Sequence, residues 1–273
     1  MAMATPDAQI AKIKRRYADG RTGQIHYRVA GSHGVRSPLL LLHPSPLSGY
    51  VFENLIGEMA RDRYVVAPDT PGFGMSDPPP SQPEIQDYAA TMLDFIAGLG
   101  LGVVDVMGYH TGSLTAVEMA QQSHQVVRKI VMVSATTFTP EETEQFKRQY
   151  APKAIAERVA QISPGWKAFR ESFWRMEPSD HRVLNIYLQG RFNPDWSPWG
   201  HHAAFNYDIT AALKRTTHPV LILNPEDDLW QYTPRARAVL RNGRVHDLPG
   251  WTHGFLDAKT TEVAHLLRDF LDT

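Results

Sequence analysis

The sequence predicts an α/β fold, in which a mostly parallel sheet is flanked by helices and a helical segment is inserted late in the chain. Three features of the sequence support this prediction. Short, wholly apolar runs alternate with segments of helical periodicity, which is typical of parallel sheets. One apolar run enters a turn bracketed by two glycines and continues as a helix. The alternation stops between residues 137 and 213, where aromatic residues accumulate.

The composition is that of an ordinary globular protein, and it narrows the possible functions. The chain has 273 residues, of which 42% are hydrophobic and 21% charged, with a formal net charge of -1. No basic block stands out, so we expect no nucleic-acid partner. The absence of cysteine excludes disulfides, cysteine-ligated zinc and thiol catalysis.

The N-terminal segment and the lengths of the apolar runs indicate the compartment. Residues 1–16 lack the apolar core of a secretory signal, and no stretch approaches ~18 consecutive apolar residues. We therefore expect a cytoplasmic protein with no membrane partner. Residues 1–11 are expected to form a loose start.

The alternating elements can be placed by their periodicity. Strands are expected over residues 13–17, 24–29, 38–42, 64–67, 103–107, 129–133, 219–223 and 244–248, and helices over 51–59, 83–99, 111–122, 233–240 and 261–271. The runs at 38–42 and 219–223 are apolar throughout, as expected of strands buried on both faces. A turn at Asp19-Gly20 is expected to join the first two strands.

The loss of strand–helix alternation between residues 137 and 213 divides the chain into a core and an insertion. We expect residues 1–136 and 214–273 to form the core, and residues 137–213 to form a helical lid over the carboxyl edge of the sheet. Most aromatic residues of the insertion are expected to pack together as a small core of its own, and a few to point into a pocket.

The sequence Gly108-Tyr109-His110-Thr111-Gly112 connects an apolar strand to a helix. A Gly-x-x-x-Gly turn between a strand and a helix lifts its middle side chain above the edge of the sheet. The flanking residues must be small, because the turn is too tight for a Cβ atom. The side chain presented here is His110.

Two further polar residues follow later strands of the predicted sheet. Asp228 lies just past the strand at 219–223, and His253 lies just past the strand at 244–248. In an open α/β sheet the loops at the carboxyl ends of the strands carry the residues that handle ligands. We therefore expect His110, Asp228 and His253 to converge.

Together these pieces resemble the α/β-hydrolase superfamily across nearly the full length of the chain. The matching residues are His43-Pro44, 69–76, 108–112, Asp228 and His253. The resemblance implies an α/β-hydrolase fold with a lid, and a catalytic triad in the order nucleophile, acid, histidine. His110 stands in the nucleophile position, where serine is usual.

The resemblance also implies an oxyanion hole made of two backbone N–H groups. One belongs to Thr111, and the other to Ser45, because Pro44 has no N–H to donate. His43 is included with the substrate-binding residues, with packing beneath the site as its alternative role. Trp174 is predicted as a substrate contact from the lid.

Three interpretations of His110 remain open. The ring could attack an acyl carbon, it could work with His253 on a water or a substrate proton, or the site could be inactive and only bind a ligand. If Asp228 holds the proton on His253, His110 is expected to be mostly neutral. Asp228 is preferred to Asp227 as the acid.

No metal or cofactor is expected. His110, His253 and Asp228 would form a two-histidine, one-carboxylate ligand set, but Asp228 is expected behind His253 and away from the pocket. The pair His201-His202 is assigned to the lid or the surface, with a place in the pocket as an alternative.

The leading hypothesis is an enzyme that hydrolyses a small, largely apolar ester or carbonyl substrate through a His-Asp-His constellation. The lid suggests such a substrate, because it offers aromatic rings and few fixed charges. A C–C bond lyase or another cofactor-free proton-transfer enzyme is the alternative. A ligand-binding protein without turnover is a further alternative.

Overall fold

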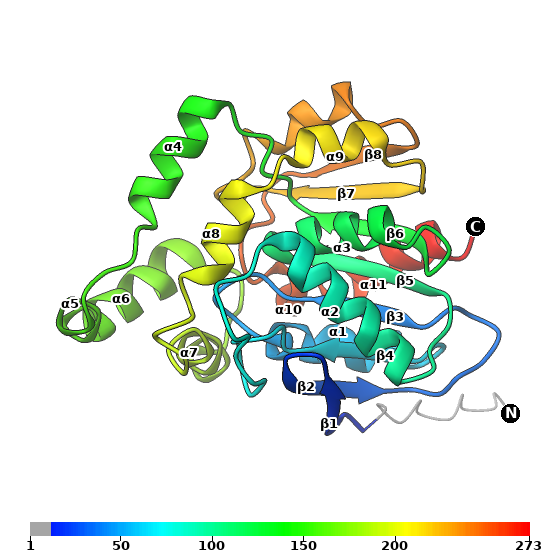
Figure 1. Cartoon of the computed structure of the whole chain (residues 1–273), viewed down its shortest axis with the longest axis horizontal. Coiled ribbons are helices and arrows are strands. Elements are labelled where there is room, and N and C mark those ends of the chain that lie inside the picture. The colour runs from blue at the N-terminus through cyan, green and yellow to red at the C-terminus, as the bar shows by residue number, and fades with distance from the viewer. Residues whose placement is uncertain (1–11) are drawn as a thin grey trace, which may run out of the picture.

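The computed structural model describes residues 12–273, apart from the side chain at position 155. The expected loose start at residues 1–11 lies outside this range. One eight-stranded sheet runs in the order β1-β2-β4-β3-β5-β6-β7-β8 (Figure 1). Its strands are β1 (Lys14–Gly20), β2 (Gly23–Ala30), β3 (Leu39–Leu42), β4 (Val65–Pro68), β5 (Val104–Tyr109), β6 (Val127–Val133), β7 (Val220–Pro225) and β8 (Gly243–Leu248).

The sheet is mostly parallel, as the sequence predicts. Only the pairs β1–β2 and β2–β4 are antiparallel, while β4, β3, β5, β6, β7 and β8 run parallel to their neighbours. Strands β3, β4, β5 and β7 are buried at every position. This burial explains why their sequences are apolar runs without alternation.

Helices cover both faces of the sheet (Figure 1). The core elements are α1 (Glu53–Met59), α2 (Ile85–Gly98), α3 (Thr111–Gln122), α9 (Ile209–Arg215), α10 (Phe255–Ala258), α11 (Thr260–Leu271) and the short helices η1 (Gly49–Phe52) and η3 (Thr233–Ala238). Apolar residues of α2, α3 and α9 form one buried cluster with the sheet. Those of α1, α10 and α11 form a second cluster on the other face.

All the regular secondary-structure elements between β6 and β7 are helices. It contains α4 (Pro140–Gln149), α5 (Ile155–Ala160), α6 (Ile162–Ala168), a π-helix η2 (Phe169–Phe173), α7 (Asp180–Gln189), α8 (Trp199–Asn206) and α9. Helices α4 to α7 project beyond one end of the sheet (Figure 1). The division of the chain at residues 137 and 213 into lid and core remains a prediction, and α9 contacts the core helix α3.

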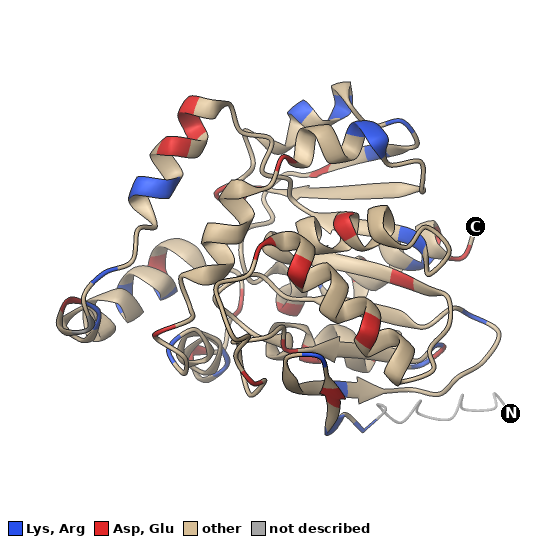
Figure 2. Cartoon of the chain, viewed as in Figure 1, with Lys and Arg blue, Asp and Glu red and all other residues tan. Residues whose placement is uncertain are grey.

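Helix α4 stands apart from the sheet and has no buried residue. Its Phe146 stacks on Phe138 and Phe205, and its own sequence also favours the helix. Thr139 and Glu142 form a capping box at its start. Acidic residues occupy its first turn and basic residues its last, visible as red and blue segments in Figure 2. This order complements the helix dipole. None of the described helices is long and apolar enough to cross a membrane.

Two local expectations are wrong. Strand β1 extends through Gly20, so the hairpin turn falls on residues 21–22 and not on Asp19-Gly20. Gly23 has a φ of 120°, which favours glycine and fixes the turn just before it. The expected α-helix at 233–240 is the 3-10 helix η3, which ends at Ala238.

The glycines of the turn after β5 are required by close backbone contacts. A Cβ atom on Gly108 would lie 2.1 Å from the carbonyl oxygen of Gly112. A Cβ atom on Gly112 would lie 2.1 Å from the carbonyl oxygen of Leu42. Backbone atoms cannot move away as a flexible side chain can, so both positions admit only glycine.

We expect Gly108→Ala to lower the free energy of unfolding by about 1–3 kcal/mol or more, because the methyl group overlaps backbone atoms. Thermal denaturation followed by circular dichroism measures this effect. Gly98→Ala is the matched control, since nothing lies within 4 Å of its Cβ position at the end of α2. Equal melting temperatures for the two variants would contradict the packing argument.

Candidate active site

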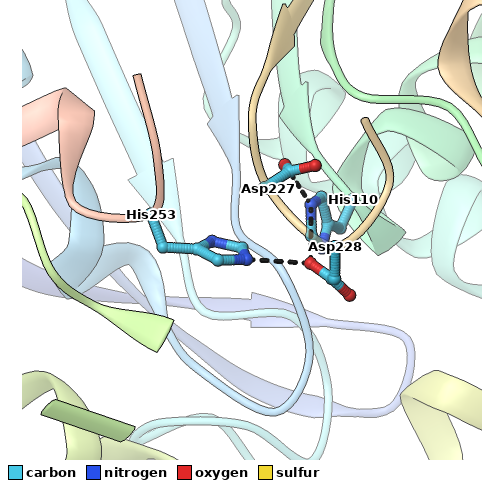
Figure 3. A group of neighbouring side chains, drawn as sticks. All are labelled: His110, Asp227, Asp228 and His253. Atoms are coloured by element: carbon cyan, nitrogen blue, oxygen red, sulfur yellow. Dashed lines mark hydrogen bonds and ion pairs between the residues drawn. The ribbon is translucent and has the colours of Figure 1, made fainter. Parts of the chain in front are cut away.

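Four ionisable side chains meet at one edge of the sheet (Figure 3). His110 lies between β5 and α3, and His253 lies in the loop after β8. Asp227 and Asp228 lie in the loop after β7. The expected convergence of His110, Asp228 and His253 is observed, and Asp227 joins them.

His110 is held by a buried carboxylate. Its Nε2 atom lies 2.8 Å from Oδ2 of Asp227 and 4.0 Å from Oδ1 of Asp228. The side chain of Asp227 is fully buried, and it also accepts bonds from Ser134 Oγ at 2.7 Å and from the Leu229 N–H at 2.8 Å. Because a carboxylate can only accept, Nε2 of His110 carries a proton.

Backbone strain accompanies this pair. His110 has a φ of 48° and Ser134 has a φ of 63°, and these are the positive-φ residues other than glycine in residues 12–273. Each such conformation costs about 1–3 kcal/mol and persists where its surroundings hold it in place. Here both strained residues hydrogen-bond to Asp227.

His253 is held from both sides. Its Nε2 atom lies 2.8 Å from Oδ1 of Asp228, and its Nδ1 atom lies 2.7 Å from the hydroxyl of Tyr109. In the neutral ring Nε2–H donates to Asp228 and the Tyr109 hydroxyl donates to Nδ1. The ring centroids of His110 and His253 are 5.4 Å apart, and Phe173 stacks on His253 at 3.8 Å.

Two expectations about the acids are wrong. Asp228 does not stand behind His253: it lies between the two imidazoles, with its side chain 35% exposed to the pocket (Figure 3). Asp227 is a second acid, not a competitor for the same role. The loop turns between them, so that one carboxylate points under the turn and the other into the cavity. The hydroxyl of Tyr109 bonds His253.

The electrostatics differ from the expectation of a neutral His110. Burial disfavours the charged ring, but Asp227 and Asp228 outweigh it and raise the pKa of His110. Burial also opposes ionisation of Asp228, yet His110 and the bond from His253 hold the pKa of that carboxyl below its usual range. The proton on His110 stabilises the fold fully below pH ~6.5, and this stabilisation is lost as the pH rises through its folded pKa.

The predicted oxyanion donors lie beside His110. Ser45 and Thr111 line a small cavity with His110 and Asp228. Neither backbone N–H donates to a described residue, and their role as oxyanion donors remains a prediction. His43 is buried beneath: its Nε2 accepts from the Thr70 N–H at 2.9 Å, and its Nδ1 bonds the Pro44 carbonyl at 3.1 Å. Both nitrogens therefore serve the fold, which favours the packing alternative for His43.

The cavity above the site has a volume of about 490 Å³. Apolar walls come from the segment between β6 and β7, including Phe169, Phe173 and the buried Trp174. Two polar side chains of that segment, Tyr150 and His201, also line it and stack at 4.5 Å. Burial lowers the pKa of His201 to about 4 and raises that of Tyr150 to about 12, so both are neutral near pH 7.

His201 and Tyr150 are the site residues that the sequence left unassigned or undecided. The pair His201-His202 is split by the helix α8, which turns His201 toward the cavity while His202 bonds the exposed Glu84. Successive helical residues point about 100° apart, so this divergence is predictable once the helix is recognised. No comparable signal marks Tyr150.

Residues 39–266 match the alpha/beta hydrolase family, and the chain belongs to this family. It is 32% identical over 145 residues to haloalkane dehalogenase 2 of Mycobacterium tuberculosis, covering 52% of this chain and 49% of that protein. It is 31% identical over 110 residues to a soluble epoxide hydrolase of Corynebacterium sp., covering 40% and 37%. The chain thus spans about half the length of the first of these relatives.

Solved structures show the same fold over nearly the whole chain. The epoxide hydrolase CorEH has a TM-score of 0.76 at 20% identity, covering 96% of this chain and 99% of that one. The enol-lactonase from Burkholderia xenovorans LB400 has a TM-score of 0.78 at 17% identity, covering 94% and 100%. At these identities the likeness shows the fold alone.

We expect Asp227→Asn to lower the pKa of His110, because the amide removes the charge that favours the imidazolium. The pKa is measured by NMR titration of the imidazole proton on Cε1. Asp247→Asn is the control, since this carboxylate bonds Arg237 and Asn224 at the surface. An unchanged His110 titration in Asp227→Asn would show that the ion pair does not form.

Proposed function

We propose that this α/β-hydrolase hydrolyses an ester or related carbonyl bond of a small, largely apolar substrate by proton transfer. The observation that carries the proposal is the pairing of His110 with Asp227 directly beside the pocket-facing pair of Asp228 and His253. The tip of the elbow carries no hydroxyl or thiol. The hydroxyl of Tyr109 bonds His253, and that of Ser113 is fully buried and bonds the carbonyls of Gly108 and Val133.

The substrate class is inferred from the cavity. Its volume of about 490 Å³ suits a small molecule, and Phe169, Phe173 and Trp174 supply apolar contact area. Neutral Tyr150 and His201 can bond a polar substituent without requiring a charged one. The names of the relatives, haloalkane dehalogenase and epoxide hydrolase, agree with a small organic substrate.

Each residue has a role in the proposed reaction. The N–H groups of Ser45 and Thr111 donate to the carbonyl oxygen and stabilise the oxyanion. The carboxylate of Asp228, backed by His253, receives a proton from the attacking water. His110 donates a proton to the leaving alkoxide, because Asp227 and Asp228 raise its pKa and so favour the protonated ring. Of the three interpretations of His110, proton transfer is therefore the one we favour.

We expect His110→Ala to reduce kcat/KM for an alkyl ester by about 10²–10⁴-fold, the usual contribution of a positioned acid or base. The loss should be smaller for a p-nitrophenyl ester, whose leaving group needs no proton. A panel of short-chain esters of both kinds measures this. The matched control is His202→Ala, because His202 is exposed and bonds Glu84 instead of lining the cavity. This variant should keep full activity.

The pH profile separates the roles of His110. A proton donor loses activity as the pH rises through its pKa, whereas a base gains it. Hydrolysis that is equal in wild type and His110→Ala for every ester would contradict the proposal. An absence of turnover, with ligand binding retained, would support the alternative of a binding protein.

A C–C bond lyase is the second candidate, and one observation favours it. The imidazole of His110 and the carboxylate of Asp228 lie 4.0 Å apart in the same pocket, which suits protonation of a carbanion-like carbon. Candidate β-hydroxy carbonyl substrates incubated in D₂O would then give products with deuterium at the new C–H bond. Asp228→Asn should abolish this incorporation, and products free of deuterium in the wild type would rule out the lyase.

A further inference from the structure

Four potential metal ligands converge in the active-site cluster. His110, Asp227, Asp228 and His253 each offer one nitrogen or oxygen atom, and these atoms all lie within 4.8 Å of one another. They come from three separate loops at the edge of the sheet. The sequence argued against a metal because Asp228 was expected behind His253. In the structure Asp228 lies between the imidazoles (Figure 3), so that objection no longer holds.

The spacing of the ligand atoms is close to that of a four-coordinate site. With bonds of about 2.0–2.2 Å, tetrahedral ligands lie about 3.3–3.6 Å apart. The closest pairs here, His110–Asp227 and His253–Asp228, are each at 2.8 Å. His110 and Asp228 are at 4.0 Å. All four atoms lie within 4.8 Å of one another, so a common centre requires the two close pairs to separate and the wider pairs to approach.

Outer hydrogen bonds already orient two of the ligands. Asp227 is fixed by Ser134 Oγ and the Leu229 N–H. The Nδ1 atom of His253 bonds the Tyr109 hydroxyl. In the metal-bound form Nδ1–H would donate to that hydroxyl, which leaves the lone pair of Nε2 directed at the cluster. Partners of this kind hold metal ligands in place, and their loss typically weakens binding 10–100-fold.

We propose that His110, Asp227, Asp228 and His253 bind one divalent first-row transition metal ion. Two imidazole nitrogens and two carboxylate oxygens suit Zn²⁺, Co²⁺, Mn²⁺ or Fe²⁺ better than Mg²⁺ or Ca²⁺, which prefer all-oxygen sites. Two carboxylates balance the charge of one such ion. Asp228 and both histidines line the cavity, which provides an entry path.

The role of the ion, unlike its binding, rests on the proposed function. A bound metal ion would acidify its water and so supply a nucleophile beside an elbow whose tip, His110, has no hydroxyl or thiol. In that form the histidine nitrogens are ligands and take no part in proton transfer. Metal-loaded and metal-free protein would then hydrolyse the ester by different routes.

The test is metal binding to the full chain without an affinity tag, stripped with a chelator. Isothermal titration with Zn²⁺ and the visible spectrum with Co²⁺ should each give one ion per chain. Asp228→Asn and His253→Ala should each weaken binding by at least about tenfold, and Tyr109→Phe by about 10–100-fold. Circular dichroism confirms that each variant is folded.

His124→Ala is the matched control, because His124 and His218 form a separate histidine pair with ring centroids 4.1 Å apart. This variant should bind Zn²⁺ as tightly as the wild type. No saturable binding to the wild type, or binding that only His124→Ala removes, would overturn the proposal. Loss of ester hydrolysis in His110→Ala without any metal binding would leave the proposed function standing alone. Metal binding without ester hydrolysis would support the metal site and contradict the proposed function.

Discussion

The ion pair between His110 and Asp227 is the interaction on which the site depends. His110 stands at the N-terminus of α3, where the helix dipole disfavours a positive charge, and its φ of 48° adds strain. The fully buried carboxylate of Asp227 compensates for both. Ser134, itself strained, and the Leu229 N–H hold that carboxylate in place. A serine at this position would not require such a partner, so the histidine and the buried acid form one unit.

The sheet edge and the helical segment contribute different polar side chains to the cavity. The four ionisable groups come from the sheet edge, whereas Tyr150 and His201 come from the helical segment above and are uncharged near pH 7. Aromatic rings of the helical segment line the cavity between these two groups of side chains. Arg191 of the helical segment also lines the cavity, so charged side chains face it from the segment above as well as from the sheet edge.

The fold was readable from the sequence because the central strands β3, β4 and β7 are buried at every position and their sequences are mostly apolar. The turn was readable because its glycines are enforced by backbone contacts. The acids were not readable in full: Asp227 and Asp228 are adjacent, and which one points inward depends on loop dihedrals that no periodicity encodes. The bond from Tyr109 to His253 joins residues 144 positions apart and leaves no local signal.

The opposite orientations of Asp227 and Asp228 constrain how this loop can evolve. Because the two carboxylates are neighbours with distinct partners, a slip of one residue between Pro225 and Leu229 would exchange them or withdraw both. His110 would then lose its counter-ion and His253 its acceptor in a single event. Point substitutions can change these side chains one at a time, but the length of the loop is fixed by the chemistry on either side of it.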